Sequence, residues 1–173
     1  MAPVVILRKA EAADASLILE LIHALAAYER EPPSTVQATV ETLTATLFPS
    51  SGTPYARVIL AFTPENEPAG MALYFNNYST WRAAPGVYLE DLFVYEKFRN
   101  RGYGKALLAA LAQETQRIGG KRLEWSVLKW NEPSIKFYES IGAQNLGLEW
   151  QVMRVTDEAL VKLAERGPEV KWE

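Results

Sequence analysis

Apolar residues recur along the chain with two spacings, one typical of helices and one typical of strands. From Asp14 to Pro32-Pro33 they recur every three or four positions, which predicts an amphipathic helix. Short apolar runs bounded by Pro, Gly or Asn predict strands. In chain order, the other predicted helices are 34–48, 105–118, 132–140 and 157–165, and the predicted strands are 4–7, 55–62, 69–75, 87–94, 122–127 and 149–155.

Two local features accompany these elements. Ser34 is predicted to cap the second helix, because its hydroxyl can accept a hydrogen bond from an amide of the first turn. Residues 76–86, which are mostly polar and include Trp81, are predicted to form a loop between two strands.

The order of the predicted elements indicates the fold class. The series β-α-α-β-β-β-α-β-α-β-α predicts an α/β (α+β) protein with a mixed central sheet flanked by helices. A length of 173 residues suits one buried core, and the chain has no repeat or linker. We therefore expect a single domain over residues 1–173.

Composition and charge exclude several functions. A net charge of −3 argues against nonspecific binding to nucleic acid. The absence of Cys excludes disulfides and thiolate metal sites, and the only histidine, His23, lies on the polar side of its helix, so no metal is expected. The apolar stretches are too short to span a membrane and no signal pattern precedes them, so we expect no membrane partner and a cytoplasmic location.

A basic, glycine-containing segment lies between the predicted strand 87–94 and the helix that follows it. Gly102 and Gly104 let a ligand approach the backbone, and amides at the start of a helix can bind phosphate oxygens. The dinucleotide fingerprint would need a glycine in place of Leu107, and Walker A would need one in place of Arg99. The segment therefore predicts a site for a phosphorylated ligand, while an ordinary basic turn remains the alternative.

Glu90 and Asp91 stand side by side in the otherwise apolar strand 87–94. Successive side chains of a regular strand point to opposite faces, so regular pleating cannot bring both into one pocket. An unpaired buried carboxylate is costly, so at least one should face a solvated cleft or a partner, with a raised pKa if it is desolvated. Proton transfer or substrate binding is one interpretation, and a structural ion pair or helix cap is the other.

The segment 130–138 combines a helix start with an ionisable phenol. Asn131 or Ser134 is predicted to cap the helix, with Pro133 in its first turn. Tyr138 can satisfy a buried hydrogen bond, or it can donate a proton in catalysis.

Arg99-x-x-Gly102-x-Gly104 after an apolar strand resembles the acetyl-CoA loop of the GNAT N-acetyltransferases. The strings at 88–94 and 130–138, followed by Gly142-Ala143, are similar to the spermidine/spermine (diamine) acetyltransferase branch, which includes thialysine acetyltransferases. The resemblance implies a GNAT fold whose sheet splays into a V between two parallel strands. It also implies transfer of the acetyl group of acetyl-CoA to a primary amine of a small substrate, by direct attack in a ternary complex, and a homodimer.

The resemblance also assigns residues to roles, with Tyr138 as general acid and Glu90 as the candidate proton acceptor. The residues implied to bind acetyl-CoA are Leu92, Phe93, Val94, Arg99, Asn100, Arg101, Gly102, Tyr103, Gly104, Lys105, Asn131, Lys136 and Tyr138. The residues implied to bind the amine are Glu29, Glu31, Trp81, Glu90, Asp91 and Trp150.

The identity of the amine stays open. Pro32-Pro33 follows Glu31 where the animal polyamine enzymes have more acidic residues, and the segment 145–149 is shorter than theirs. A substrate with both an amine and a carboxylate, such as thialysine, therefore competes with a linear polyamine. A peptide acetyltransferase and a non-catalytic acetyl-CoA-binding module are the alternative functions.

Overall fold

The computed structural model describes residues 4–166, and the chain forms two compact units, residues 1–126 and residues 127–173. Each unit is described by itself. The prediction of one domain over residues 1–173 stays a prediction, and its two ends lie outside the described residues.

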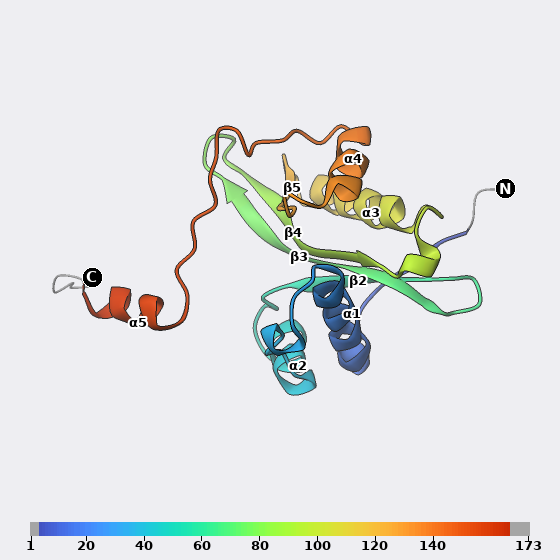
Figure 1. Ribbon diagram of the computed structural model, residues 1–173, viewed down its shortest axis with the longest axis horizontal. Coiled ribbons are helices and arrows are strands. Elements are labelled where there is room, and N and C mark those ends of the chain that lie inside the picture. The colour runs from blue at the N-terminus through green and yellow to red at the C-terminus, as the bar shows by residue number, and fades with distance from the viewer. Residues whose placement is uncertain (1–3, 167–173) are drawn as a thin grey trace. The chain divides into compact units, whose positions relative to one another are not determined.

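The first unit contains a five-stranded sheet in the order β1-β2-β3-β4-β5 (Figure 1). The first four strands are antiparallel neighbours, and β5 runs parallel to β4. The strands are β1 (Ile6–Lys9), β2 (Arg57–Phe62), β3 (Pro68–Ser79), β4 (Ala84–Val94) and β5 (Leu123–Trp125). The predicted mixed sheet is confirmed.

Helices cover both faces of this sheet (Figure 1). The helices α1 (Ala15–Tyr28) and α2 (Val40–Leu47) lie on one face, and α3 (Tyr103–Arg117) packs on the other. Short 3-10 turns at Ala12–Asp14, Pro33–Thr35 and Glu96–Phe98 connect these elements. The second unit contains α4 (Glu132–Ser140) and α5 (Asp157–Glu165), both with the predicted bounds. No helix within residues 4–166 is both long enough and apolar enough to cross a membrane.

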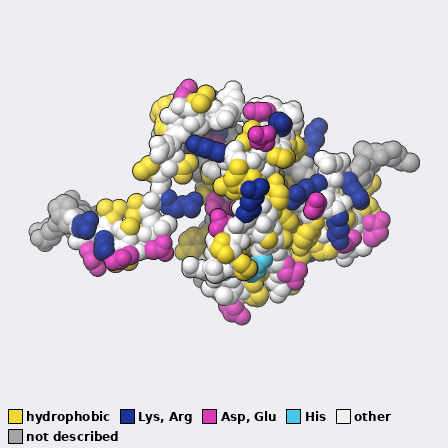
Figure 2. Space-filling model, viewed as in Figure 1, with side chains coloured by type: hydrophobic (Ala, Val, Ile, Leu, Met, Phe, Trp, Pro, Cys, Tyr) yellow, Lys and Arg dark blue, Asp and Glu magenta, His cyan; other side chains and the backbone are white. Residues whose placement is uncertain are grey.

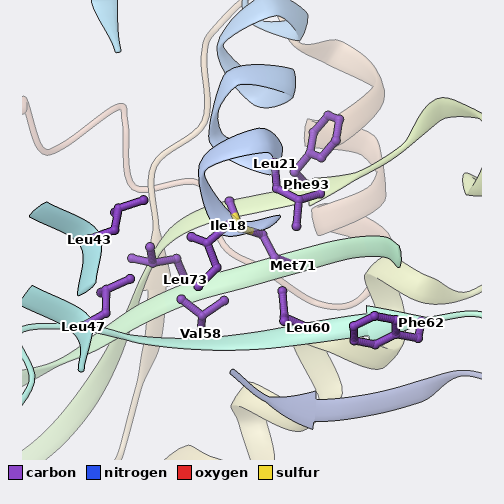
Figure 3. Packing of buried hydrophobic residues seen from close by; sticks show 10 residues of the cluster. All are labelled: Ile18, Leu21, Leu43, Leu47, Val58, Leu60, Phe62, Met71, Leu73 and Phe93. Carbon is purple, nitrogen blue, oxygen red and sulfur yellow. The ribbon is translucent and has the colours of Figure 1, made fainter. Parts of the chain in front are cut away.

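The main core lies between the sheet and the pair α1 and α2 (Figure 3). Ile18 and Leu21 of α1 are fully buried, as the helical spacing of apolar residues predicts. They meet side chains from α2, β2, β3 and β4 that alternate along each strand, since only every second residue faces α1. The rest of the cluster is Leu43, Leu47, Val58, Leu60, Phe62, Met71, Leu73 and Phe93.

The start of the second helix differs from the prediction. Ser34 lies in the 3-10 turn Pro33–Thr35, and α2 begins only at Val40. Thr39 caps it instead: its hydroxyl accepts a hydrogen bond from the Thr42 amide at 3.2 Å, and its own amide donates to the Thr42 hydroxyl at 2.9 Å. This reciprocal pair satisfies two amide groups at once, an advantage that a single Ser34 hydroxyl lacks.

Two other predicted elements also differ. The loop predicted at 76–86 is mostly strand, because β3 continues to Ser79 and β4 begins at Ala84. Its polar residues Asn76 and Tyr78 occupy the exposed face of an antiparallel pair, where polarity does not oppose strand formation. The strand predicted at 149–155 is absent from the described residues, and that segment is exposed and irregular. Its apolar pattern predicted a strand, but no strand partner for it is found in residues 4–166.

We expect Leu21→Ala to lower the free energy of unfolding by about 2–5 kcal/mol, because the lost side chain leaves a cavity in a fully buried site. Leu148→Ala is the matched control, since Leu148 is 96% exposed and the same change should cost less than about 0.5 kcal/mol. Urea unfolding followed by circular dichroism measures both. Equal losses in the two variants would contradict the placement of α1 on the core.

Candidate functional site

A β-bulge interrupts the pairing of β3 with β4 at Glu90. Leu73 lies opposite Asp91, but Tyr74, the next residue of β3, lies opposite Leu89. Glu90 is therefore an extra residue in β4, and side chains beyond it point to the face opposite the one that regular alternation would give. Asp91 shares the α1 face with Leu73 and Phe93, whereas Leu89 and Tyr74 face the other side.

The sheet opens at the same place. The parallel pairing of β4 with β5 joins Val87 to Leu123, Tyr88 to Glu124 and Leu89 to Trp125. Within the described residues it goes no further, although β4 continues to Val94. Beyond Leu89, therefore, no strand of the described residues pairs with the β5 side of β4, and an extended ligand could pair with its backbone groups. This is the splayed V predicted between two parallel strands.

Acidic side chains gather where β4 meets the end of α1. Burial, together with the charges of Glu90 and Glu29, raises the pKa of Asp91 to about 6. Burial, together with the charge of Glu31, also raises the pKa of Glu29, the residue after the last turn of α1. The Thr35 hydroxyl donates to Glu31 at 3.2 Å. We call Glu29, Glu31, Glu90 and Asp91 the carboxylate cluster.

The carboxylate cluster suits a cationic ligand. The charges of Glu90 and Glu29 disfavour ionisation of Asp91, and the charge of Glu31 disfavours ionisation of Glu29; a bound ammonium group would relieve that repulsion. Figure 2 shows that acidic side chains (magenta) and Lys and Arg side chains (dark blue) are distributed over the visible face. Among residues 4–166 no group of three or more His, Cys, Asp and Glu is arranged to hold a metal ion.

The glycine-containing segment forms the start of α3. Asn100 has φ 60 and Gly102 has φ 90, so two left-handed residues turn the chain into the helix. Asn and Gly are the residue types that adopt this conformation most readily. The first helical hydrogen bond runs from the Ala106 amide to the Gly102 carbonyl at 2.9 Å. The amides of residues 103–105 therefore have no partner within the helix and point out of its N-terminus, where an anion can accept their hydrogen bonds.

Three cationic side chains flank this helix start. Arg101 and Lys105 are exposed. Arg99 is half-buried: its Nε donates to the Val94 carbonyl at 3.0 Å, and its guanidinium carbon lies 4.4 Å from the centre of the Tyr28 ring. Tyr28 was not among the residues predicted for the site, because nothing local in the sequence connects it with Arg99.

Other residues predicted to bind the cofactor differ in what they offer. Phe93 belongs to the core cluster and Tyr103 is 4% exposed, so only their backbone groups are available to a ligand. Leu92 and Val94 are half-buried on the opposite side of β4 from Phe93.

Trp81 lies away from the carboxylate cluster. It is 89% exposed in the turn 80–83 that joins β3 to β4. Glu90 follows six residues after Ala84 along β4, which corresponds to about 20 Å at the usual rise of a strand. The structure therefore does not bring Trp81 together with Glu90 within one chain.

The remaining predicted site residues belong to the second unit. Asn131 caps α4, its side-chain oxygen accepting from the Ser134 amide at 3.4 Å, which confirms one of the two predicted caps. Tyr138 is half-buried next to Phe137, with ring centres 5.5 Å apart. Lys136 pairs with Glu132 at 3.8 Å, and Trp150 is 63% exposed. That these residues approach the first unit stays a prediction.

A separate hollow of about 450 Å³ lies on the α3 face of the sheet. Tyr74 lines it and points away from Asp91, because the bulge places these two residues on opposite faces. The hollow is therefore distinct from the carboxylate cluster, and it does not contain the predicted site. Its lining is Leu7, Arg8, Lys9, Ile59, Tyr74, Ala110, Gln113, Glu114 and Arg117.

Solved structures of other proteins share this mixed sheet and the helices that cover it. An integron cassette protein from V. cholerae matches with a TM-score of 0.75 and 25% identity, over 95% of this chain and 99% of that one. The aminoglycoside acetyltransferase meta-AAC0020 from a soil metagenomic sample shares the fold with a TM-score of 0.70 and 20% identity, over 88% of this chain and 95% of that one.

The chain belongs to the acetyltransferase (GNAT) family, whose model matches residues 21–143. It is 32% identical to the thialysine N-epsilon-acetyltransferase of Bos taurus over 92% of this chain and 97% of that protein. It is 45% identical to the L-ornithine N5-acetyltransferase NATA1 of Arabidopsis thaliana, over 53% of this chain but only 40% of that protein's length. The protein is an acyltransferase of the GNAT type.

We expect Asp91→Asn to stabilise the protein above pH 6. An aspartate in the unfolded chain has a pKa of about 3.9, so between about pH 4 and pH 6 only the folded protein keeps the Asp91 proton, and stability falls as the pH rises through that window. Asparagine has no charge to desolvate, so the variant should gain up to roughly 3 kcal/mol at pH 7.5.

Urea unfolding at several pH values from 4 to 8 measures this difference. Glu65→Gln is the control, because it makes the same chemical change at an exposed site. If the stability difference between Asp91→Asn and wild type does not change with pH, Asp91 is not desolvated as the structure describes.

Proposed function

We propose that the protein transfers the acetyl group of acetyl-CoA to a primary amine of a small polyamine or lysine-like substrate, by direct attack in a ternary complex. The observation that carries this proposal is the coincidence of three features in the first unit. The opening between β4 and β5, the helix start at residues 102–105 and the carboxylate cluster all adjoin the second half of β4.

The described residues fit acetyl-CoA. Free amides at the start of α3, with Arg101 and Lys105 beside them, suit a pyrophosphate. Backbone groups of β4 beyond Leu89 are placed to pair with an extended amide-containing arm, as a neighbouring strand would. When bound, acetyl-CoA supplies an activated acetyl thioester. On the resemblance, Asn131 and Lys136 of α4 are proposed to complete this site.

The carboxylate cluster is proposed to bind the amine and to take its proton. An alkyl amine with a pKa near ~10.4 is protonated at neutral pH and must lose that proton before it can attack. Glu90, directly or through water, is the proposed acceptor. Asp91 with a pKa of about 6 lies next to it, and a carboxyl group that titrates near working pH is well suited to proton transfer.

Tyr138 is proposed to protonate the leaving thiolate. A thiol of ordinary pKa, about 8.5, is a better leaving group when a phenol within hydrogen-bond reach donates to its sulfur. Trp150 is proposed to pack against the alkyl part of the substrate.

The substrate class follows from charge. Several carboxylates at one place favour a substrate with more than one positive group, such as a diamine. Relatives named for thialysine and ornithine act on amines that also have a carboxylate. A relative in Homo sapiens is named as spermidine/spermine N(1)-acetyltransferase-like protein 1. We propose a small amine of this group as the substrate, a homodimer as the assembly and the cytoplasm as the location.

A thiol-release assay with acetyl-CoA separates the candidates. Spermidine, putrescine, thialysine, ornithine and a lysine-containing peptide are each compared at saturating acetyl-CoA. We expect release of CoA with at least one small amine and much less with the peptide. Turnover with the peptide alone would favour the peptide acetyltransferase, and tight CoA binding with no turnover would favour the non-catalytic module.

Removing both charges from Arg101 and Lys105 by changing each to Gln should weaken CoA binding about tenfold or more, because each cation is proposed to make a charge-assisted contact with phosphate. The matched control changes the exposed Arg82 and Lys121 to Gln, which removes the same charge away from residues 99–105. Calorimetry with CoA at two salt concentrations measures both. Equal affinities for the two variants would remove these side chains from the site.

Tyr138→Phe should reduce turnover by about 10²-fold or more with little change in CoA affinity, because only the proton on the phenol is lost. Tyr55→Phe is the control, since Tyr55 is 81% exposed and has no proposed role. Steady-state kinetics with the best amine of the assay give kcat, and calorimetry gives the affinity. Wild-type turnover in Tyr138→Phe would show that another group donates this proton.

A further inference from the structure

Arg99 connects two parts of the first unit that are distant in the sequence. Its Nε donates to the carbonyl of Val94, the last residue of β4, at 3.0 Å. Its guanidinium carbon lies over the ring of Tyr28, the last residue of α1, at 4.4 Å from the ring centre. Arg99 therefore fixes the end of α1 against the end of β4.

The end of α1 is also where the carboxylate cluster begins. Glu29 directly follows Tyr28, and its amide donates to the Leu25 carbonyl at 2.9 Å, the last hydrogen bond of the helix between residues four positions apart. The Glu29 charge is close enough to raise the pKa of Asp91 on β4. The placement of Tyr28 therefore determines the placement of the Glu29 backbone, because the two residues belong to one helical turn.

Arg99 is thus connected with the carboxylate cluster along two routes. It lies over Tyr28, the residue before Glu29, and it donates to Val94, which follows Asp91 on β4. These contacts use its Nε and its guanidinium carbon, and Glu29 and Asp91 interact through their charges. A guanidinium has two further amino groups, and among residues 4–166 those of Arg99 make no hydrogen bond. They stay available to an anion at the start of α3.

We infer that Arg99 and Tyr28 are positioning residues that hold Glu29 in the carboxylate cluster. A residue of the proposed cofactor loop thereby also sets the geometry of the amine site. An anion bound to the free amino groups of Arg99 restricts the guanidinium, and with it Tyr28 and Glu29. Cofactor and amine sites that share a residue in this way are energetically coupled, and such coupling is reciprocal. This inference rests on the proposed function.

The test compares Tyr28→Leu, which removes the aromatic face, with Tyr28→Phe, which keeps it. Tyr28→Leu should raise the KM of the amine about three- to tenfold, the range expected when a half-buried cation–π contact is lost. The Kd of CoA in the absence of amine should stay within about twofold of wild type. Hydrogen exchange of the Glu29 amide, measured by NMR in the ligand-free full chain, should accelerate. Because Tyr28→Phe keeps the aromatic ring, its effect should be smaller than that of Tyr28→Leu in all three measurements.

A second variant changes the other residue of the same contact, Arg99. Arg99→Lys keeps the charge but loses the Nε bond to Val94 and the planar face, so it too should accelerate exchange at Glu29. It supports or overturns the inference by itself if Tyr28→Leu does not fold, as thermal unfolding would reveal.

The inference is overturned if Tyr28→Leu has the wild-type amine KM or wild-type exchange at Glu29, or if Tyr28→Phe is equally impaired. Failure of the proposed function is a different result: wild-type protein that neither binds CoA nor acetylates any amine. The exchange measurements need no ligand and would still decide whether Arg99 and Tyr28 hold Glu29.

Discussion

The β-bulge at Glu90 is the constraint on which the site depends. One extra residue in β4 places Asp91 on the α1 face, although Leu89, two residues earlier, faces the other side. A regular strand would point Asp91 to the same side as Leu89, where α3 packs against the sheet and a carboxylate would be costly to bury. Pairing with β5 also ends at Leu89. The bulge therefore lies at the position where the sheet opens and where the carboxylate cluster begins on β4.

Opposite charges approach the end of β4 from two helices. The start of α3 brings amide groups, Arg101 and Lys105, and the end of α1 brings Glu29 and Glu31. An anionic cofactor and a cationic amine would therefore each meet a surface of complementary sign. Complementary fields of this kind raise encounter rates and exclude wrong ligands more than they strengthen binding. Arg99, which contacts both β4 and α1, is where the two surfaces adjoin.

Local patterns in the sequence were sufficient to predict most helices and strands of the fold. Helical spacing predicted α1 because Ile18 and Leu21 must be buried together, and the bounds of α4 and α5 were correct to the residue. The prediction that Ser34 caps the second helix was wrong, because the choice between two possible caps depends on tertiary neighbours. The prediction of a loop at residues 76–86 was wrong as well, because a strand that is exposed on one face can be polar. The glycine-containing helix start was visible in the sequence as well. The bulge at Glu90 and the contact of Tyr28 with Arg99 were not, because both depend on strand register and packing between distant segments.

Within the described residues, no strand pairs with the β5 side of β4 beyond Leu89. An unpaired strand edge can template pairing with a foreign strand. Glu90 and Asp91 stand at the beginning of this edge. If two copies of the chain paired along this edge, Glu90 and Asp91 of both copies would come close together, and the repulsion between four carboxylates opposes aggregation. The carboxylates proposed to bind an amine thus also protect the unpaired edge of β4 from pairing with another chain.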